Sequence, residues 1–120
     1  MSRSKQKGTH FESQVAAYMS ERLGAEITRA PLTGAKDRGD LRGLTVRGKR
    51  TVVECKNCKK MELSQWLDET EAEKGNDDAE FGVVVHKRRG CGDATFGETY
   101  VTMTLDTFLA ITAGGFDLLE

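Results

Sequence analysis

The chain has 120 residues, of which 38% are hydrophobic and 31% are charged, and its formal net charge at pH 7 is −1. This length suits one domain around one modest core, so we expect a single domain over residues 1–120. No apolar run approaches the roughly 18 residues of a membrane span, and the start, MSRSKQKGTHFE, lacks the apolar stretch of a signal peptide. The composition argues against membrane and secreted proteins, and we expect a cytoplasmic protein with reduced cysteines.

The small net charge hides an uneven distribution. Residues 1–60 contain 14 of the 18 Lys and Arg but only 6 of the 19 Asp and Glu, a net charge of +8, whereas residues 61–120 have a net charge of −9. Such a split indicates a basic face built from the first half of the chain, which would suit a polyanion. A charged surface that merely solvates the protein would give the same pattern.

The first third of the chain is expected to form an arm, a helix and a strand. Residues 1–8 carry three basic residues and no acid, which is typical of a mobile basic arm. Apolar residues at helical spacing predict a helix over His10–Leu23, and Gly24 stands where a helix would end. A short strand over 25–31 and a glycine-containing loop over 32–39 follow.

The rest of the chain is expected to supply most of the sheet. Residues 40–46 and 50–57 are typical of a hairpin with a turn at 47–49. We then expect a helix from Ser64 as N-cap to about Lys74, a buried strand over Phe81–Lys87, a strand over 99–104 and a helix over Leu105–Ala113. This order predicts an α/β (α+β) fold in which a mixed central β-sheet of about five strands is flanked by helices.

Two charged residues, Glu54 and Lys56, stand in an otherwise apolar strand. Side chains of a strand alternate between its two faces, so Glu54 and Lys56 point the same way, while Cys55 between them points into the core. If the hairpin turns at Gly48, Asp40 lies eight residues before the turn and Lys56 eight residues after it. The open end of the hairpin would therefore gather two carboxylates and one ammonium group.

This set of groups indicates chemistry at a phosphodiester. Two converging carboxylates are hard oxygen ligands suited to Mg²⁺ or Mn²⁺, which keep several waters and complete their shell with substrate phosphate. A lysine beside the ion can orient or help to deprotonate an attacking water, and it can stabilise charge on the phosphate oxygens.

At these residues the chain resembles the PD-(D/E)XK nuclease superfamily. Gly39-Asp40 followed by Val52-Val53-Glu54-Cys55-Lys56 is similar to the superfamily motif, although Gly39 stands where the signature has proline. The segment KGTHFESQVAAYM, which contains Glu12, resembles the first helix of archaeal and phage Holliday-junction resolvases. Ser64-Gln65-Trp66 matches a position where many members carry a glutamine on the helix after E-x-K.

The resemblance implies a restriction-endonuclease-like core and a Mg²⁺-dependent endonuclease, with Mn²⁺ able to substitute. Asp40 and Glu54 would bind the ion together with the backbone carbonyl of Cys55, and Glu12 would complete the site. Lys56 would position the water, with Gln65 as a helper. The implied substrate is branched DNA, above all the four-way junction, and the implied assembly is a homodimer, because two symmetric strands must be cut. A phage protein would act in the host cytoplasm.

The predicted DNA contacts are basic residues outside this motif. They are Arg3, Lys5, Lys7, Arg29, Lys36, Arg38, Lys87, Arg88 and Arg89. Each of them alone is equally compatible with ordinary surface.

Several alternatives remain open for the site residues. Asp37 competes with Asp40 for the metal role. The residues Glu54 and Lys56 could form a surface ion pair, and Glu12 and Gln65 could be solvated helix residues. His10, near Glu12, could act as a base but is more typical of an exposed helix start, and Trp66 of a core or interface anchor.

Rival functions also remain open. A nuclease of this fold could act on flaps, nicks or specific duplex sites, and a non-catalytic DNA-binding module could keep the same fold. Cys55, Cys58, His86 and Cys91 count four potential zinc ligands, but Cys55 lies inside an apolar strand rather than on a tight turn, so a buried thiol is the preferred interpretation.

Overall fold

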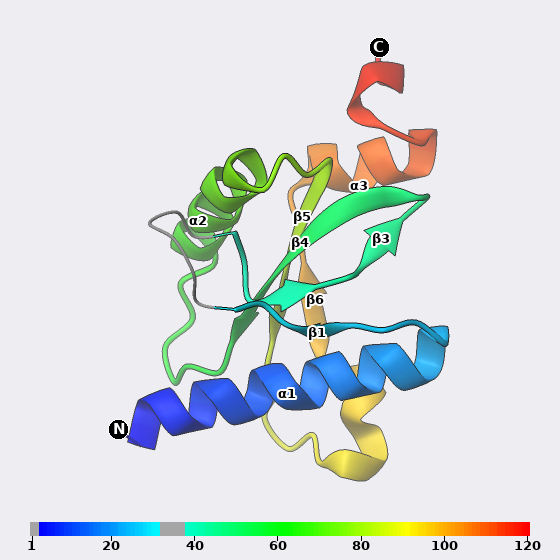
Figure 1. Cartoon of the computed structure of the whole chain (residues 1–120). Helices are drawn as coiled ribbons and strands as arrows, with labels where there is room; N and C mark the ends of the chain where they lie inside the picture. Colours follow the sequence, from blue (N-terminus) through cyan, green and yellow to red (C-terminus); the bar gives the residue numbers. More distant parts are fainter. Residues whose placement is uncertain (1–2, 32–37) are drawn as a thin grey trace.

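The computed structural model describes residues 3–31 and 38–120, which form a mixed β-sheet with helices on both faces (Figure 1). The elements in chain order are α1 (Arg3–Leu23), β1 (Thr28–Arg29), β2 (Leu41–Arg42), β3 (Thr45–Val46), β4 (Lys49–Lys56), α2 (Leu63–Asn76), β5 (Phe81–His86), the 3-10 helix η1 (Asp93–Glu98), β6 (Tyr100–Thr102), α3 (Leu105–Ala113) and the 3-10 helix η2 (Phe116–Leu118). Over these described residues, no helix is both long and apolar enough to cross a membrane.

The sheet is built around two parallel strands, β4 and β5. Its order is β1-β2-β4-β5-β6, with β3 also paired to β4, and every pairing other than β4–β5 is antiparallel. Helix α2 connects the parallel pair, as such a crossover requires. The predicted mixed sheet flanked by helices is therefore confirmed, and the part of the chain that the structure describes forms six strands where about five were predicted.

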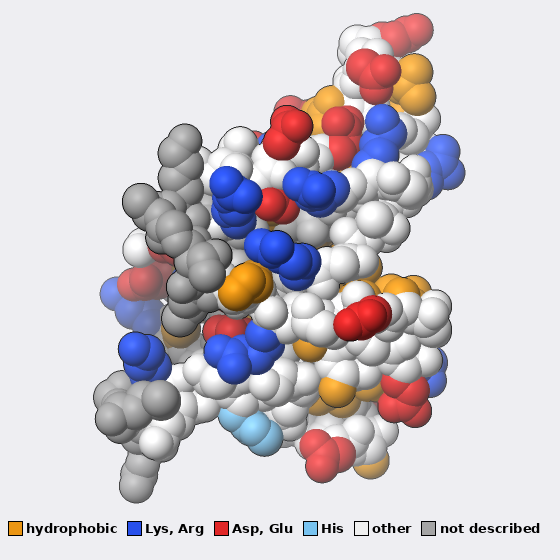
Figure 2. Space-filling view, in the orientation of Figure 1, with side chains coloured by type: hydrophobic (Ala, Val, Ile, Leu, Met, Phe, Trp, Pro, Cys, Tyr) orange, Lys and Arg blue, Asp and Glu red, His pale blue; other side chains and the backbone are white. Residues whose placement is uncertain are grey.

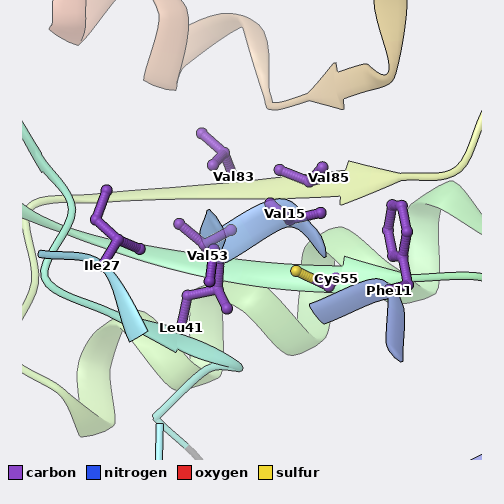
Figure 3. Close-up of a cluster of buried hydrophobic side chains, with 9 residues drawn as sticks. Phe11, Val15, Ile27, Leu41, Val53, Cys55, Val83 and Val85 are labelled. Atoms are coloured by element: carbon purple, nitrogen blue, oxygen red, sulfur yellow. The ribbon is translucent and has the colours of Figure 1, made fainter. Parts of the chain in front are cut away.

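The two faces of β4 carry different chemistry. One face packs against α1 in an apolar cluster (Figure 3), to which α1 contributes Phe11 and Val15 and the strands contribute Leu41, Val53, Cys55, Val83 and Val85. Since side chains alternate along a strand, Glu54 must point to the opposite face, the one that α2 covers. Trp66, Thr70 and Glu73 are the buried residues of α2 on that side.

Several predicted boundaries were wrong. Helix α1 begins at Arg3, so the residues expected as an arm are helical from Arg3 onward, because no strong helix breaker precedes the left-handed Gly24. The strand expected over 25–31 is reduced to β1. Helix α2 begins at Leu63 with Glu62 as its cap, so Ser64 lies inside its first turn instead of capping it.

The hairpin of β3 and β4 contains a shift in pairing. Its turn, Arg47–Gly48, has positive φ at both residues, which is typical of a two-residue hairpin turn. Thr45 pairs with Arg50 beside the turn, but Leu41 of β2 pairs with Val53. Four residues on one side thus correspond to three on the other, which is a β-bulge.

The bulge determines which residue faces Asp40. Gly43, in the bulge, has φ +107°, and a Cβ atom there would collide with the carbonyl oxygen of Glu26. Without the extra residue, the pairing set by the turn would place Asp40 opposite Cys55, on the apolar face. With the extra residue, the pairing of Leu41 with Val53 continues to Asp40 opposite Glu54. Asp40 and Glu54 then lie on the same face of the sheet, the one that α2 covers.

Candidate active site

Asp40 is anchored to β4 through its backbone and its side chain. Its N–H donates a hydrogen bond to the carbonyl oxygen of Val53 (2.9 Å), and its carboxylate Oδ2 accepts one from the N–H of Cys55 (2.8 Å). The preceding residue, Gly39, has φ +95°, and a Cβ atom there would lie 2.8 Å from Cγ1 of Val52. Proline fixes φ near about −65°, so this backbone excludes the proline of the superfamily signature.

Glu54 is the most buried acid of the predicted set, with only 5% of its surface exposed. Its carboxyl group is hydrogen-bonded to those of Asp40 and Glu73. Burial, followed by the contact with Glu73, raises the pKa of Glu54 to about 8, although Asp40 and Lys56 act in the opposite direction. Carboxyl groups this close together repel one another when they are ionised, so the site favours a cation.

Lys56 lies on the same face as Glu54 and forms an ion pair with α2. Its Nζ is 3.2 Å from Oε2 of Glu69, and Oε1 of Glu69 accepts a hydrogen bond from Nε2 of Gln65 (3.2 Å). Burial alone would lower the pKa of Lys56, but the hydrogen bond with Glu69 and the charge of Glu54 raise it overall. Lys56 is therefore a cation at neutral pH.

Glu12 approaches this site from α1 but is paired elsewhere. Its Oε1 accepts a hydrogen bond from Nε of Arg29 at 3.3 Å. Its pKa is raised first by burial and then by the charge of Asp40, and the contact with Arg29 acts in the opposite direction. Glu12 is thus in electrostatic contact with Asp40, while its hydrogen bond goes to β1.

The predicted metal ligands are only partly brought together. Within residues 3–31 and 38–120, no three His, Cys, Asp or Glu side chains are arranged to hold a metal ion. The hydrogen-bonded carboxyl groups of Asp40 and Glu54 do fit a divalent ion, because an ion that prefers carboxylate oxygens can replace the proton between them. Two protein carboxylates with several waters are a common arrangement for Mg²⁺.

The comparison with protein families agrees with this arrangement. The model of a family described as "Phage putative PDDEXK endonuclease" matches residues 3–113. The chain belongs to this family. No curated protein and no solved structure matches the chain. The predicted resemblance to the PD-(D/E)XK nucleases is thereby confirmed, and as an endonuclease of this family the protein has DNA as its implied substrate.

Two acids close to the motif of this endonuclease were not predicted. Glu73 contacts Glu54 and is 3% exposed, and Glu69 contacts Lys56. Both lie at four-residue steps from Gln65, so all three share one side of α2. The four-residue spacing was the one sign in the sequence that Glu69 and Glu73 share a side of α2 with Gln65. An acid on a helix is usually solvated, however, and the sequence alone does not show which side of the helix is buried.

All of the predicted DNA contacts except Lys36 fall within the described residues. Lys36 and the competing acid Asp37 fall outside the described residues. Arg3 begins α1, Lys5 and Lys7 are exposed in its first turns, and Arg38, Lys87, Arg88 and Arg89 are exposed. The N–H of Lys87 donates to the carbonyl oxygen of Lys56 (3.0 Å), which places the start of the 87–89 segment beside the site.

Two further lysines follow the strand that carries Glu54 and Lys56 in this endonuclease. Lys59 and Lys60 are exposed in the segment that follows β4, and they were not among the predicted contacts. Figure 2 shows Lys and Arg side chains gathered over the middle and left of the face drawn there. Among the predicted contacts, Arg29 is paired with Glu12, and Arg88 is paired with Glu98 (3.3 Å) and lies over the ring of Tyr100.

The four potential zinc ligands do not form one group. Cys55 is buried in the apolar core that faces α1, and this burial raises the pKa of its thiol above the ordinary value for a cysteine. His86 lies on the opposite face, between the rings of Trp66 and Tyr100, and its Nε2 is 2.7 Å from Oγ1 of Thr102. Trp66 is itself buried and is a core residue.

The remaining sulfur and imidazole groups are placed as follows. Cys58 is exposed, and Sγ of Cys91 donates to the carbonyl oxygen of Thr95 at 2.7 Å. His10 is exposed on α1.

Proposed function

We propose that this chain is a Mg²⁺-dependent endonuclease that hydrolyses DNA phosphodiesters at a site formed by Asp40, Glu54 and Lys56. The direct contact between the carboxyl groups of Asp40 and Glu54 supports this most strongly. It depends on the bulge at Gly43, which sets the pairing of β2 with β4. Mn²⁺ should substitute for Mg²⁺, since both prefer oxygen ligands.

Each acid has a distinct task in this proposal. Asp40 and Glu54 hold the divalent ion, and the backbone carbonyl of Cys55 is the third protein ligand. When bound, the ion lowers the pKa of a coordinated water and neutralises charge on the phosphate. Glu12 completes the site when Arg29 releases it, and a DNA phosphate beside β1 is a suitable alternative partner for the guanidinium group.

Lys56 acts as a cation in this proposal. Its raised pKa makes it a poor base at neutral pH, so its ammonium group orients the attacking water and stabilises negative charge on the phosphate oxygens. Gln65, hydrogen-bonded to the same Glu69, assists from the start of α2. The basic residues of α1, 38 and 87–89 hold the DNA backbone.

The four-way junction is the proposed substrate, and a homodimer acting in the host cytoplasm is the proposed assembly. The resemblance of the first helix to junction resolvases supports the substrate. An apolar surface of α3 supports the dimer: Leu105, Phe108 and Leu109 are 71%, 56% and 41% exposed. Exposed apolar side chains that lie together on one helix mark an interaction surface.

Cleavage of a labelled mobile four-way junction, compared with linear duplex, flap and nicked DNA, with and without Mg²⁺, tests the proposal. We expect Mg²⁺-dependent cutting that favours the junction, and its loss in Glu54→Ala and Lys56→Ala with junction binding retained. Preference for a flap, a nick or a duplex sequence would keep the chemistry and change the substrate. DNA binding without any cutting would leave a non-catalytic binding module.

A further inference from the structure

Helix α2 carries a row of polar residues that runs along the site strand. Gln65, Glu69 and Glu73 recur every four residues, and a helix rises about 6 Å over that step. Glu54 and Lys56 of β4 recur every two residues, and a strand rises about 6.6 Å over that step. The two steps match, so successive acids of α2 meet successive site residues: Glu73 contacts Glu54, and Glu69 contacts Lys56.

Glu69 is the member of this row that joins two site residues. One of its oxygens, Oε2, faces Nζ of Lys56, and the other, Oε1, accepts from Nε2 of Gln65, each at 3.2 Å. Lys56 has a long flexible side chain that is 21% exposed, so a partner is needed to hold its ammonium group in one place. A carboxylate with one donor on each oxygen fixes both donors relative to each other.

We propose that Glu69 is a positioning residue, which holds the ammonium group of Lys56 and the amide of Gln65 in the arrangement that phosphodiester hydrolysis requires. This inference rests on the function proposed above, because it assigns Glu69 a task only if Lys56 and Gln65 serve the reaction. Glu69 itself does not touch the substrate; it acts through its two partners.

The same contacts have little importance for stability. Glu69 is 39% exposed, and ion pairs with this much access to water contribute little to folding stability. Removing the charge of Glu69 should therefore leave the fold intact and change the reaction. Replacing a residue that orients a metal ligand from behind changes activity by about 10- to 100-fold, and we expect an effect of the same order for Glu69, which orients Lys56 beside the proposed ion.

Two variants of Glu69 and one control test the proposal. Glu69→Gln keeps the shape and the acceptor for Gln65 but removes the charge facing Lys56. Glu69→Asp keeps the charge and shortens the side chain by one methylene group. Asp68→Asn is the matched control, because it removes one negative charge from the adjacent, exposed position of α2.

Three quantities are measured for each protein. The single-turnover cleavage rate is measured with the junction and Mg²⁺, the junction affinity is measured by titration with the same DNA, and the ¹³C relaxation of the Cε group of Lys56 is measured on the metal-free protein without DNA. We expect Glu69→Gln to cut about 10- to 100-fold more slowly at unchanged affinity, with a more mobile Lys56. Glu69→Asp should fall between wild type and Glu69→Gln, and Asp68→Asn should match wild type.

The outcomes separate this inference from the proposed function. If wild type cuts, Lys56→Ala does not, and Glu69→Gln matches Asp68→Asn in rate and in Lys56 mobility, the positioning role is wrong and the proposed function stands. If wild type shows no metal-dependent cutting, both are overturned. If Glu69→Gln does not fold, Glu69→Asp decides, because wild-type rate and wild-type Lys56 mobility in that variant contradict the proposal.

Discussion

The carboxylate of Asp40 accepts a hydrogen bond from the backbone N–H of Cys55, at 2.8 Å. This contact ties the acid to the residue between Glu54 and Lys56, so the position of Asp40 is set by the strand that carries the other two groups. It depends on the pairing of β2 with β4, and that pairing depends on the bulge at Gly43. The backbone therefore brings the acids together before any ion is present.

Replacing Gly43 with alanine should destabilise the protein. The residue has φ +107°, and a Cβ atom would collide with the carbonyl oxygen of Glu26, so we expect a loss of roughly 1–3 kcal/mol in the free energy of unfolding, measured in urea. Gly75→Ala, in α2 with open space around it, is the control and should be neutral or stabilising by up to about 1 kcal/mol. Equal stability of Gly43→Ala and wild type would contradict the role of the bulge.

Without divalent ions, the protein should lose stability as the pH rises from about 4.5 to about 8. Glu54 has a pKa of about 8 in the folded protein and an ordinary value of 4.5, so between these values the folded state keeps a proton that the unfolded state has lost. Its stabilising effect is complete below the lower value and is lost as the pH rises through the higher one. Each pKa unit corresponds to about 1.4 kcal/mol, so the loss should reach a few kcal/mol.

The variant Glu54→Gln checks this assignment, because its amide cannot titrate. Its unfolding free energy should be much less dependent on pH over the same range, and Mg²⁺ should stabilise wild type at pH 8 but not the variant. A pH dependence that persists unchanged in Glu54→Gln would assign the effect to other groups near this carboxyl, such as Asp40 or Glu73.

Replacing Glu12 with glutamine should slow metal-dependent cutting while DNA binding persists. The glutamine can still accept a hydrogen bond from Arg29, so the local structure should be kept, but it cannot supply a carboxylate beside Asp40. We expect a decrease of about 10-fold or more in the cleavage rate. Glu21→Gln, exposed on the same helix, is the control. Wild-type cutting by Glu12→Gln would remove Glu12 from the site.

The alternation of β4 was enough to predict that Glu54 and Lys56 share a face, but the pairing that brings Asp40 to that face was predicted wrongly. Counting from Gly48 placed Asp40 opposite Lys56, whereas the structure places it opposite Glu54. The turn is centred between Arg47 and Gly48, and the bulge adds one more residue. Together the two shifts change the partner of Asp40 by two residues. Because side chains alternate with a period of two, Asp40 still lies on the face that carries Glu54 and Lys56.

The partners of the site residues were beyond what the sequence could predict. The burial of Glu73 and the contact of Glu69 with Lys56 depend on how α2 rotates over the sheet, which no local pattern specifies. The pairing of Glu12 with Arg29 likewise joins two elements that are distant in sequence. The arm over 1–8 was predicted from charge alone, and charge does not prevent a helix from extending to Arg3.

If the proposed homodimer forms through α3, replacing Phe108 with glutamate should convert it to a monomer. Phe108 is 56% exposed on α3, and a charge in an apolar interface is costly to bury. Sedimentation equilibrium should give a dimer for wild type and a monomer for Phe108→Glu. Ala17→Glu, which adds the same charge to the exposed side of α1, should remain dimeric. A monomeric wild type would contradict the proposed dimer, and a dimeric Phe108→Glu would place the dimer contact away from Phe108.

The proposal that Asp40 and Glu54 together hold a divalent ion can be checked by calorimetric titration of the metal-free protein with Mn²⁺. We expect binding to wild type that is lost in both Asp40→Asn and Glu54→Gln, while Asp68→Asn binds as wild type does. Binding that survives both substitutions, or no binding to wild type, would contradict it.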